Sequence, residues 1–162
     1  MNKLIFLALL LSASINTSAQ AASAEDCVAA DVTDSHGVKL TFSQHAFENG
    51  AYDLVIAQSP DDIKRVTFEH AKTCTYQALA IAEGVGWGWH LAWADAKAVY
   101  IARMDGEAWV SSVPKKIAAE NTRELRFTQN AGLLTLNWQA GGASYSMQSG
   151  DEGRSWQLPA KN

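Results

Sequence analysis

The stretch YSMQSGDEGRSW, Tyr145–Trp156, combines two features that together indicate a β fold. Its first part alternates apolar and polar residues, with Ser146 between Tyr145 and Met147, and this is the period of a half-buried strand. A run of polar and glycine residues follows and ends at Trp156, as is typical of a turn between two strands. The stretch therefore predicts a strand, a turn, and an apolar residue that opens the next segment.

The same alternation recurs along the rest of the chain. It predicts strands at Val38–Gln44, Tyr52–Gln58, Lys64–His70, Ala98–Met104, Leu125–Gln129, Leu133–Gln139 and Ala143–Gln148. Turn-forming clusters lie between them, at Glu48–Gly50, Ser59–Asp62, Met104–Glu107, Gln129–Gly132 and Ala140–Gly142. Two stretches are less regular: Ala71–Glu83 fits a strand or a short helix, and Val113–Glu124 fits an irregular or one-turn helical connection. The pattern predicts a single all-β domain over residues 25–162.

Two other stretches repeat the plan of the opening one. VYIARMDGEAW ends at Trp109, and LVIAQSPDDIKRV ends at Val66. Trp109 lies 43 residues after Val66, and Trp156 lies 47 residues after Trp109. A period near 45 fits four short strands per unit, as in propeller blades. We therefore expect about three antiparallel, blade-like repeats; the alternative is a β-sandwich whose hairpins happen to look alike.

The eight residues Ser149–Trp156 resemble the Asp-box, S-x-D-x-G-x-[ST]-W, of sialidase-like β-propellers, which is also called the BNR repeat. The match covers every specified position of one motif, and the other two copies are degenerate. In those families the motif lies on the turn between the third and fourth strands of a blade, away from the active site. The resemblance therefore implies a propeller-like fold and a structural role for the motif residues, which are Ser149, Asp151, Gly153, Ser155 and Trp156.

The chemistry of these residues fits that role. Asp151 can accept hydrogen bonds from backbone N–H groups of the turn, and the Ser149 hydroxyl can join the same network. Gly153 can adopt a positive φ, which strains other residues. Trp156 then packs between sheets. A calcium loop is disfavoured, because Asp151 and Glu152 supply too few oxygen ligands.

The resemblance does not extend to the activity of sialidases. The chain is a third to a half of the length such enzymes need, and the [FY]-R-I-P signature is absent. The five arginines show no spacing expected of a carboxylate-binding triad; they are Arg65, Arg103, Arg123, Arg126 and Arg154. The sequence also lacks a G-x-S-x-G motif, zinc-type histidine spacing and a phosphate-binding loop. We expect no catalytic residue, no metal and no cofactor, and a remnant glycoside hydrolase is the least favoured reading.

The N-terminus has the pattern of a secretory signal peptide. Lys3 precedes an apolar run at Leu4–Leu11, which is too short to span a bilayer, and two A-x-A sites follow. Cleavage after Ala21 or Ala24 would leave about 138 residues with a net charge near −5. Residues 1–24 are thus expected to be removed, and the mature chain to be periplasmic or secreted with no membrane span. No basic stripe suggests nucleic acid as a partner.

The chain has two cysteines, Cys27 and Cys74. In an oxidising compartment such a pair usually forms one disulfide, which would stabilise the fold by roughly 3–5 kcal/mol on the chain-entropy model. The alternative is a reactive thiol with a resolving partner, although no C-x-x-C motif supports it.

The most unusual composition lies in GVGWGWHLAWAD, Gly84–Asp95. In a strand, Trp87, Trp89 and Trp93 would share one face because their separations are even, and His90 would lie on the opposite face. The shared face is either packed in the core or an aromatic binding surface, since tryptophan is enriched at binding hot spots and stacks on sugars. Trp87, Trp89, His90 and Trp93 are therefore the candidate binding residues.

Two functional hypotheses follow. The first is a non-enzymatic protein that binds and neutralises a protein partner, such as a cell-wall hydrolase or a delivered toxin, in the manner of an inhibitor or immunity protein. A basic partner would suit the acidic charge. The second is a small carbohydrate-binding module that uses the tryptophan face. Three open blades also leave sheet edges unpaired, so a homodimer that completes a six-unit ring is a further hypothesis.

Overall fold

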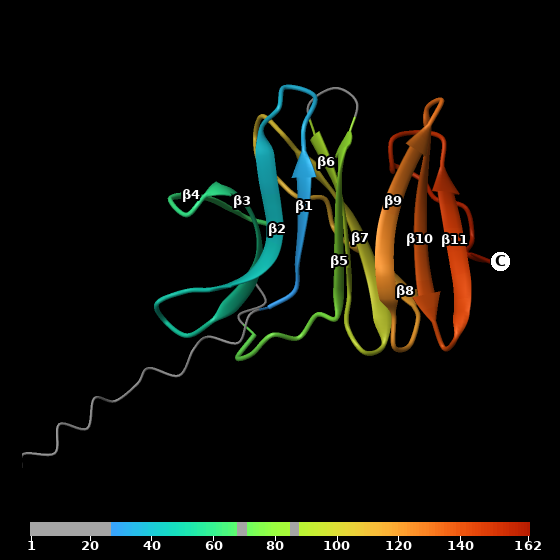
Figure 1. Ribbon diagram of the computed structural model, residues 1–162, viewed down its shortest axis with the longest axis horizontal. Helices are drawn as coiled ribbons and strands as arrows, with labels where there is room; N and C mark the ends of the chain where they lie inside the picture. Colours follow the sequence, from blue (N-terminus) through green and yellow to red (C-terminus); the bar gives the residue numbers. More distant parts are fainter. Residues whose placement is uncertain (1–26, 68–70, 85–87) are drawn as a thin grey trace, which may run out of the picture.

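The computed structural model describes residues 27–67, 71–84 and 88–162, and every regular element within them is a β-strand (Figure 1). The strands form three antiparallel four-stranded sheets. The first sheet contains β1 (Ala29–Thr33), β2 (Lys39–Ala46), β3 (Tyr52–Ser59) and β4 (Asp62–Arg65). The second contains β5 (Ala78–Gly84), β6 (Gly88–Ala94), β7 (Ala98–Asp105) and β8 (Lys115–Ala118). The third contains β9 (Arg123–Asn130), β10 (Leu133–Ala140), β11 (Ala143–Ser149) and β12 (Ala160–Lys161).

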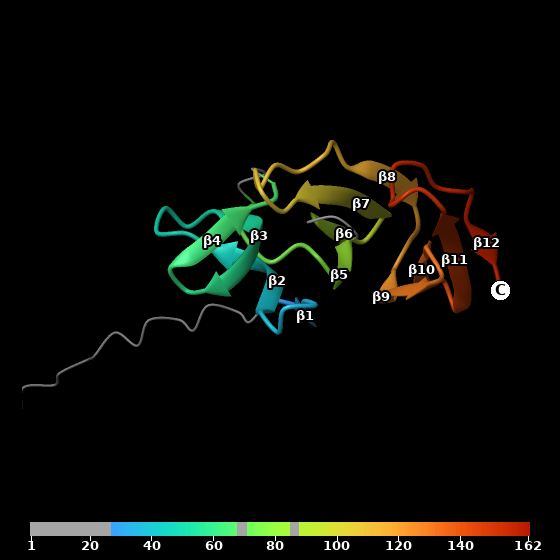
Figure 2. The ribbon, with the colours of Figure 1, turned by 90° about the horizontal axis from the view of Figure 1, so that it is seen from above.

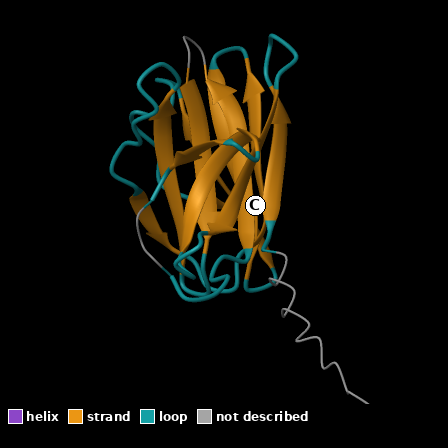
Figure 3. Ribbon diagram, turned by 90° about the vertical axis from the view of Figure 1, so that its left-hand side faces the viewer, coloured by secondary structure: helices purple, strands orange, loops and turns teal. Residues whose placement is uncertain are grey.

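Each sheet is a meander in which neighbouring strands are consecutive in the chain. The predicted turn residues explain the tight hairpins of the third sheet. Ala131 and Gly132 have φ angles of 47° and 81°, and Gly141 and Gly142 have φ angles of 56° and 77°. Two residues with positive φ between paired strands form the turn that matches strand twist. The loops gather at the two ends of the strands (Figure 3).

The three sheets pack in series, as blades do, and not as the two sheets of a sandwich. The first strands of the sheets lie next to one another, with β1 against β5 and β5 against β9 (Figures 1 and 2). Among the described strands, those of the first sheet do not contact those of the third. The three sheets therefore form an open arc, and the predicted blade-like all-β fold is confirmed.

The middle sheet is buried on both faces, and strand β6 shows how the sequence achieves this. Leu91 and Trp93 face the first sheet, where they join a core with Phe42. Of the alternate residues, which face the third sheet, Ala92 and Ala94 are small and pack in a second core with Trp138. The small side chains let the third sheet approach closely, so two cores of different composition hold the arc together.

The outward faces of the first and third sheets are polar. On the first sheet Asp31 accepts a hydrogen bond of 2.7 Å from Thr41 and pairs with Lys39 at 2.8 Å. On the third sheet the corresponding positions are polar and mostly exposed; they include Arg126, Thr128, Thr135, Asn137, Gln139, Ser144, Ser146 and Gln148. This alternation of a buried and a solvated face is the usual pattern of an antiparallel sheet.

Two sequence expectations need correction, and one that was left open is resolved. Val113–Glu124, expected to be irregular or helical, contains strand β8, whose backbone pairs with the edge of β7. The strand expected at Lys64–His70 lies earlier, at Asp62–Arg65, and residues 68–70 fall outside the described residues. The stretch Ala71–Glu83, left open between strand and helix, ends in strand β5. Each case depends on backbone pairing with a neighbouring strand, which propensity does not encode.

The predicted disulfide is present. It joins Cys27, just before β1, to Cys74 in the connection between β4 and β5, and the two Cα atoms lie 5.5 Å apart. The buried Gln44 side chain fixes the same connection, because its carbonyl oxygen accepts a hydrogen bond of 2.8 Å from the Thr75 N–H and its amide donates to the Thr73 carbonyl. The start of the first sheet is therefore tied to the entrance of the second.

Candidate functional site

The motif Ser149–Trp156 lies between β11 and β12, which are the third and fourth strands of their sheet. Asp151 Oδ1 accepts hydrogen bonds from the Ser149 hydroxyl and the Ser155 N–H, both at 2.8 Å, and Oδ2 accepts from the Ser155 hydroxyl at 2.6 Å. The Gly153 N–H donates to the Ser149 hydroxyl oxygen at 2.8 Å. These bonds, those from Ser155 first, hold the pKa of Asp151 down at about 2.

The two degenerate copies occupy the equivalent place in the other sheets, between β3 and β4 and between β7 and β8. In the second copy Asp105 Oδ1 accepts hydrogen bonds from the Glu107 N–H at 3.0 Å and the Ala108 N–H at 2.6 Å. In the first copy Asp62 instead pairs with Lys64 at 2.8 Å. An aspartate thus stabilises the third-to-fourth strand turn in the second and third sheets, but by different bonds.

The turn of the third sheet also packs against the middle sheet. Trp156 lies beside Phe127 in the second core, with ring centroids 6.5 Å apart. Gly153 has a φ of 71°, and a Cβ atom there would lie 3.1 Å from Nδ1 of His90. The motif therefore works as a contact between sheets as well as a turn, and this is the environment of one candidate residue, His90.

His90 is 2% exposed and faces the third sheet. Neither of its ring nitrogens has a hydrogen-bond partner among the described residues. Burial lowers the pKa of the imidazole, and Arg103 adds to this, while the Glu152 carboxylate, 3.7 Å from Nε2, opposes it. His90 is therefore a buried imidazole between two sheets whose surroundings favour its neutral form, and it also borders a cavity of about 330 Å3 with Arg103 and Glu152.

The tryptophans of the candidate surface divide into different environments. Trp89 and Trp93 share the face of β6 that meets the first sheet, and His90 lies on the opposite face. Trp93 is 0% exposed and stacks on Tyr100 with centroids 5.7 Å apart, so no ligand can reach its ring. Trp87 lies outside the described residues. Trp89, in contrast to Trp93, borders a cavity.

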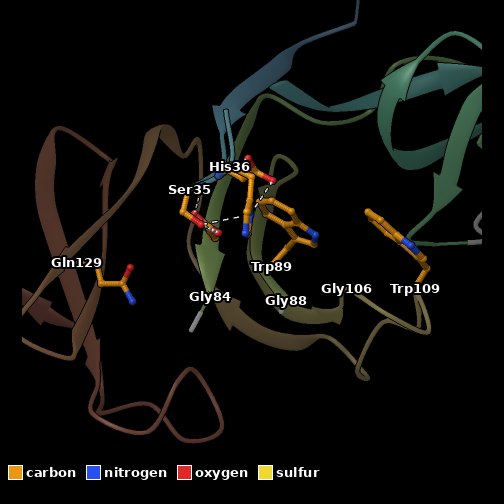
Figure 4. A pocket seen from close by; sticks show the side chains of 10 residues that line it. Ser35, His36, Gly84, Gly88, Trp89, Gly106, Trp109 and Gln129 are labelled. Atoms are coloured by element: carbon orange, nitrogen blue, oxygen red, sulfur yellow. Dashed lines mark hydrogen bonds and ion pairs between the residues drawn. The ribbon is translucent and has the colours of Figure 1, made fainter. Parts of the chain in front are cut away.

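That cavity, of about 550 Å3, opens at the end of the strands that carries the β1–β2 turn and the β7–β8 connection. We call it the end cavity. Figure 4 shows its arrangement: Trp109 and Gln129 lie on opposite sides, with Trp89, Ser35 and His36 between them. Residues of all three sheets or their connections thus line it; they are Asp34, Ser35, His36, Glu83, Gly84, Gly88, Trp89, Gly106, Trp109 and Gln129.

A carboxylate clamp holds the first and second sheets together at this cavity. Glu83 accepts two hydrogen bonds of 2.7 Å from Ser35, one from its N–H and one from its hydroxyl (Figure 4). The Ser35 turn is itself fixed by Asp34, whose Oδ1 accepts from the N–H groups of His36 and Val38 at 2.9 and 2.7 Å. The two carboxylates are therefore held in place by neutral donors.

Two backbone features at the rim of the cavity depend on particular residues, and the first is a glycine that lets two strands come together. A Cβ atom at Gly88 would lie 2.9 Å from the Met104 carbonyl oxygen, so any other residue there would displace backbone. Trp109 has a φ of 55°, which a non-glycine residue rarely adopts, and its N–H donates to the Asp105 carbonyl at 2.9 Å. The Lys64 ammonium lies 5.7 Å from the centroid of the Trp109 ring.

Sequence reasoning missed most of the residues that line the end cavity, including Asp34, Glu83, Trp109 and Gln129. One signal was available: Glu83 pairs directly with Trp89 across β5 and β6, and a strand register for these segments would have placed them together. The contribution of Asp34 and Gln129 had no signal, because they come from turns and strands of the other two sheets.

Among the described residues no group of three histidine, cysteine or acidic side chains is arranged to hold a metal ion. The described part of the chain also contains no helix with the length and apolar character to cross a membrane.

No protein-family model matches the sequence. No curated protein matches it either.

Proposed function

We propose that this protein is a secreted or periplasmic, non-enzymatic binding protein that contacts a protein partner through the end carrying the β1–β2 turn and the β7–β8 connection. The disulfide between Cys27 and Cys74 supports an oxidising compartment. The proposal of a binding role rests on the surface at this end, since the sequence carries no motif of catalysis.

The observation that carries the proposal is the β7–β8 connection, residues 106–114. It exposes the apolar side chain of Val110, at 64%, directly after Trp109, which lines the end cavity, and that of Val113, at 91%, further along the connection. An exposed loop that mixes apolar, aromatic and polar residues next to a cavity is typical of protein recognition, where an aromatic anchor is surrounded by weaker contacts.

The charge of the chain suggests the kind of partner. The whole sequence has a formal net charge of −4, and an acidic protein attracts basic partners at a distance. By size and compartment, inhibitors of cell-wall hydrolases and immunity proteins against delivered toxins are the closest analogues. This analogy concerns size, charge and compartment alone.

A carbohydrate ligand is the second candidate, and the end cavity is the observation in its favour. Trp89 and Trp109 line it together with Gln129, and aromatic rings with polar neighbours are the groups that bind sugars. Trp89 is only 8% exposed, however, which leaves little ring face for a sugar to stack on. The protein partner is therefore preferred.

A capture experiment with a matched variant tests the proposal. The oxidised protein is immobilised and exposed to periplasmic and extracellular extracts, beside Trp109→Ala and the control Leu158→Ala. The control removes an apolar side chain that is 89% exposed in the connection between β11 and β12. We expect one protein to be retained by the wild type and the control and lost by Trp109→Ala, and its enzymatic or toxic activity to fall on binding. Retention of peptidoglycan with no protein captured would instead establish the carbohydrate candidate.

A further inference from the structure

We propose that the end cavity receives the side chain of a lysine or arginine from the protein partner. This inference rests on the proposed function and specifies the chemistry by which the partner is recognised. It follows from the charge, the walls and the unused hydrogen-bonding capacity of the cavity.

The charged side chains of the cavity are acidic. Asp34 and Glu83 line it, and no lysine or arginine is among its described lining residues. Within the described chain neither carboxylate pairs with a lysine or arginine; the one ion-pair contact is between Asp34 and His36, at 3.9 Å. Two carboxylates therefore line one cavity with no described lysine or arginine paired to either of them, which favours an incoming positive charge.

Both carboxylates also keep acceptor capacity. A carboxylate offers about four lone-pair sites. Glu83 uses two of them for the hydrogen bonds from Ser35. Asp34 uses Oδ1 for two backbone N–H groups, whereas Oδ2 has the distant His36 contact. An ammonium or guanidinium group, which carries donors alone, can use these sites without displacing the bonds that hold the turn.

The walls suit the aliphatic stem of such a side chain. Trp89 and Trp109 provide apolar surface, and Gly84, Gly88 and Gly106, which also line the cavity, add no side chain to it. Lysine and arginine bury their methylene groups along apolar surface while the charged head reaches polar groups. Lys64 near Trp109 shows that a cation already lies within reach of this ring in the free protein.

The test uses three small probes with the oxidised protein: Nα-acetyl-lysine amide, Nα-acetyl-arginine amide and the uncharged Nα-acetyl-norleucine amide. Binding is followed by NMR of the tryptophan indole N–H groups and by calorimetry. We expect a charged probe to shift the Trp89 and Trp109 signals and to bind at least about tenfold more tightly than the norleucine probe. Equal affinity for all three probes, or no shift with any, would overturn the inference.

Charge-removing variants locate the site. In Asp34→Asn one amide oxygen can accept both backbone bonds that Oδ1 accepts in the wild type. In Glu83→Gln the amide oxygen can accept from the Ser35 N–H, and the amide NH2 can donate to the Ser35 hydroxyl oxygen once that hydroxyl has rotated. We expect each to weaken the charged probe about tenfold. The control is Glu120→Gln, which removes one exposed carboxylate at the opposite end of the middle sheet. A loss of affinity as large in the control as in Glu83→Gln would contradict a local site.

The same variants separate this inference from the proposed function. Suppose that a protein partner is captured by the wild type and lost by Trp109→Ala, but that Glu83→Gln binds it unchanged. The proposed function is then supported, and the inference that the cavity receives a basic side chain is wrong. If chitotetraose binds the cavity and the charged probes do not, the protein partner and the basic side chain are both wrong, and the carbohydrate candidate remains.

Discussion

Gly153 in the turn between β11 and β12 lies directly against His90 on β6, so close that a Cβ atom at Gly153 would be 3.1 Å from Nδ1 of the imidazole. One contact therefore links the third-to-fourth strand turn of the third sheet to the interior of the middle sheet. The contact joins a glycine with a positive φ to a buried titratable group, and substitutions can test the contribution of each to stability.

The first prediction concerns Gly153. Replacement by alanine forces a side chain into a φ of 71° and against His90, so we expect Gly153→Ala to lower the free energy of unfolding by about 1–3 kcal/mol. Urea unfolding measures this. Gly150→Ala is the control, because a Cβ there meets nothing within 4 Å and its φ is not positive. Equal stability of the two variants would contradict the contact.

The second prediction concerns His90 and pH. Because burial lowers the pKa of this imidazole below 6.5 in the folded protein, the unfolded chain binds the proton more readily. The stability that the folded protein gains from keeping His90 neutral is therefore complete above about pH 6.5, and it is lost as the pH falls below this value. We expect urea midpoints to decrease from about pH 7.5 to 5.5, and His90→Phe to flatten that decrease.

The control for this series is His36→Gln, whose imidazole has a side chain 66% exposed. A flattening seen in His90→Phe and not in His36→Gln would belong to the buried ring. A wild-type midpoint that stays constant over this pH range would show that His90 is not held neutral by its surroundings.

The third prediction concerns Asp151 in acid. Its pKa is lowered from 3.8 to about 2 by hydrogen bonds, first those from Ser155, so its stabilisation is present above pH 3.8 and is lost as the pH falls toward 2. We expect Asp151→Asn to be less stable at neutral pH and less sensitive to acid. Thermal midpoints at several pH values measure this, with the exposed Asp61→Asn as the control.

The fourth prediction concerns the disulfide. Cys27 and Cys74 are 47 residues apart in the sequence, and the crosslink limits the unfolded chain. We expect Cys27→Ser/Cys74→Ser to lose about 3–5 kcal/mol of unfolding free energy, measured by urea titration. A loss below about 1 kcal/mol would mean that Gln44 and the first core already fix the β4–β5 connection.

The fifth prediction concerns the oligomeric state. A dimer that completes a six-unit ring would join outward faces of the first and third sheets, and those faces carry Asp31, Lys39, Arg126 and Asn137 instead of apolar side chains. Obligate homodimers bury more apolar surface than this. We therefore expect light scattering to give the mass of one chain at high concentration. A stable twofold mass would support the ring hypothesis instead.

Much of the fold was predictable because its signals are local. The alternation in LLTLNWQ and the glycine turn after it determine strand β10 and its hairpin without reference to the rest of the chain. The four residues of β8 and the two of β12 were missed, since such short strands exist through their pairing with β7 and β11. The strand propensity of a segment does not depend on which strand it pairs with, so it could not predict them.

The candidate site was less predictable. Even spacing placed Trp89 and Trp93 on one face, but not which of them would be enclosed, because that depends on how the first sheet covers β6. The end cavity joins Asp34 to Gln129, which are 95 residues apart in sequence, through the packing of three sheets. The two residues come together only when the three sheets have packed, so no single segment of the sequence predicts that they are neighbours.

The double burial of the middle sheet has a consequence for the order of folding. A chain made from its N-terminus completes the first two sheets while residues 123–149 of the third are still to come. Until then the face of β6 with His90, Ala92 and Ala94 has no cover. The nascent protein therefore passes through a stage in which one whole face of its central layer is exposed, and the strands that are made last are those that cover it.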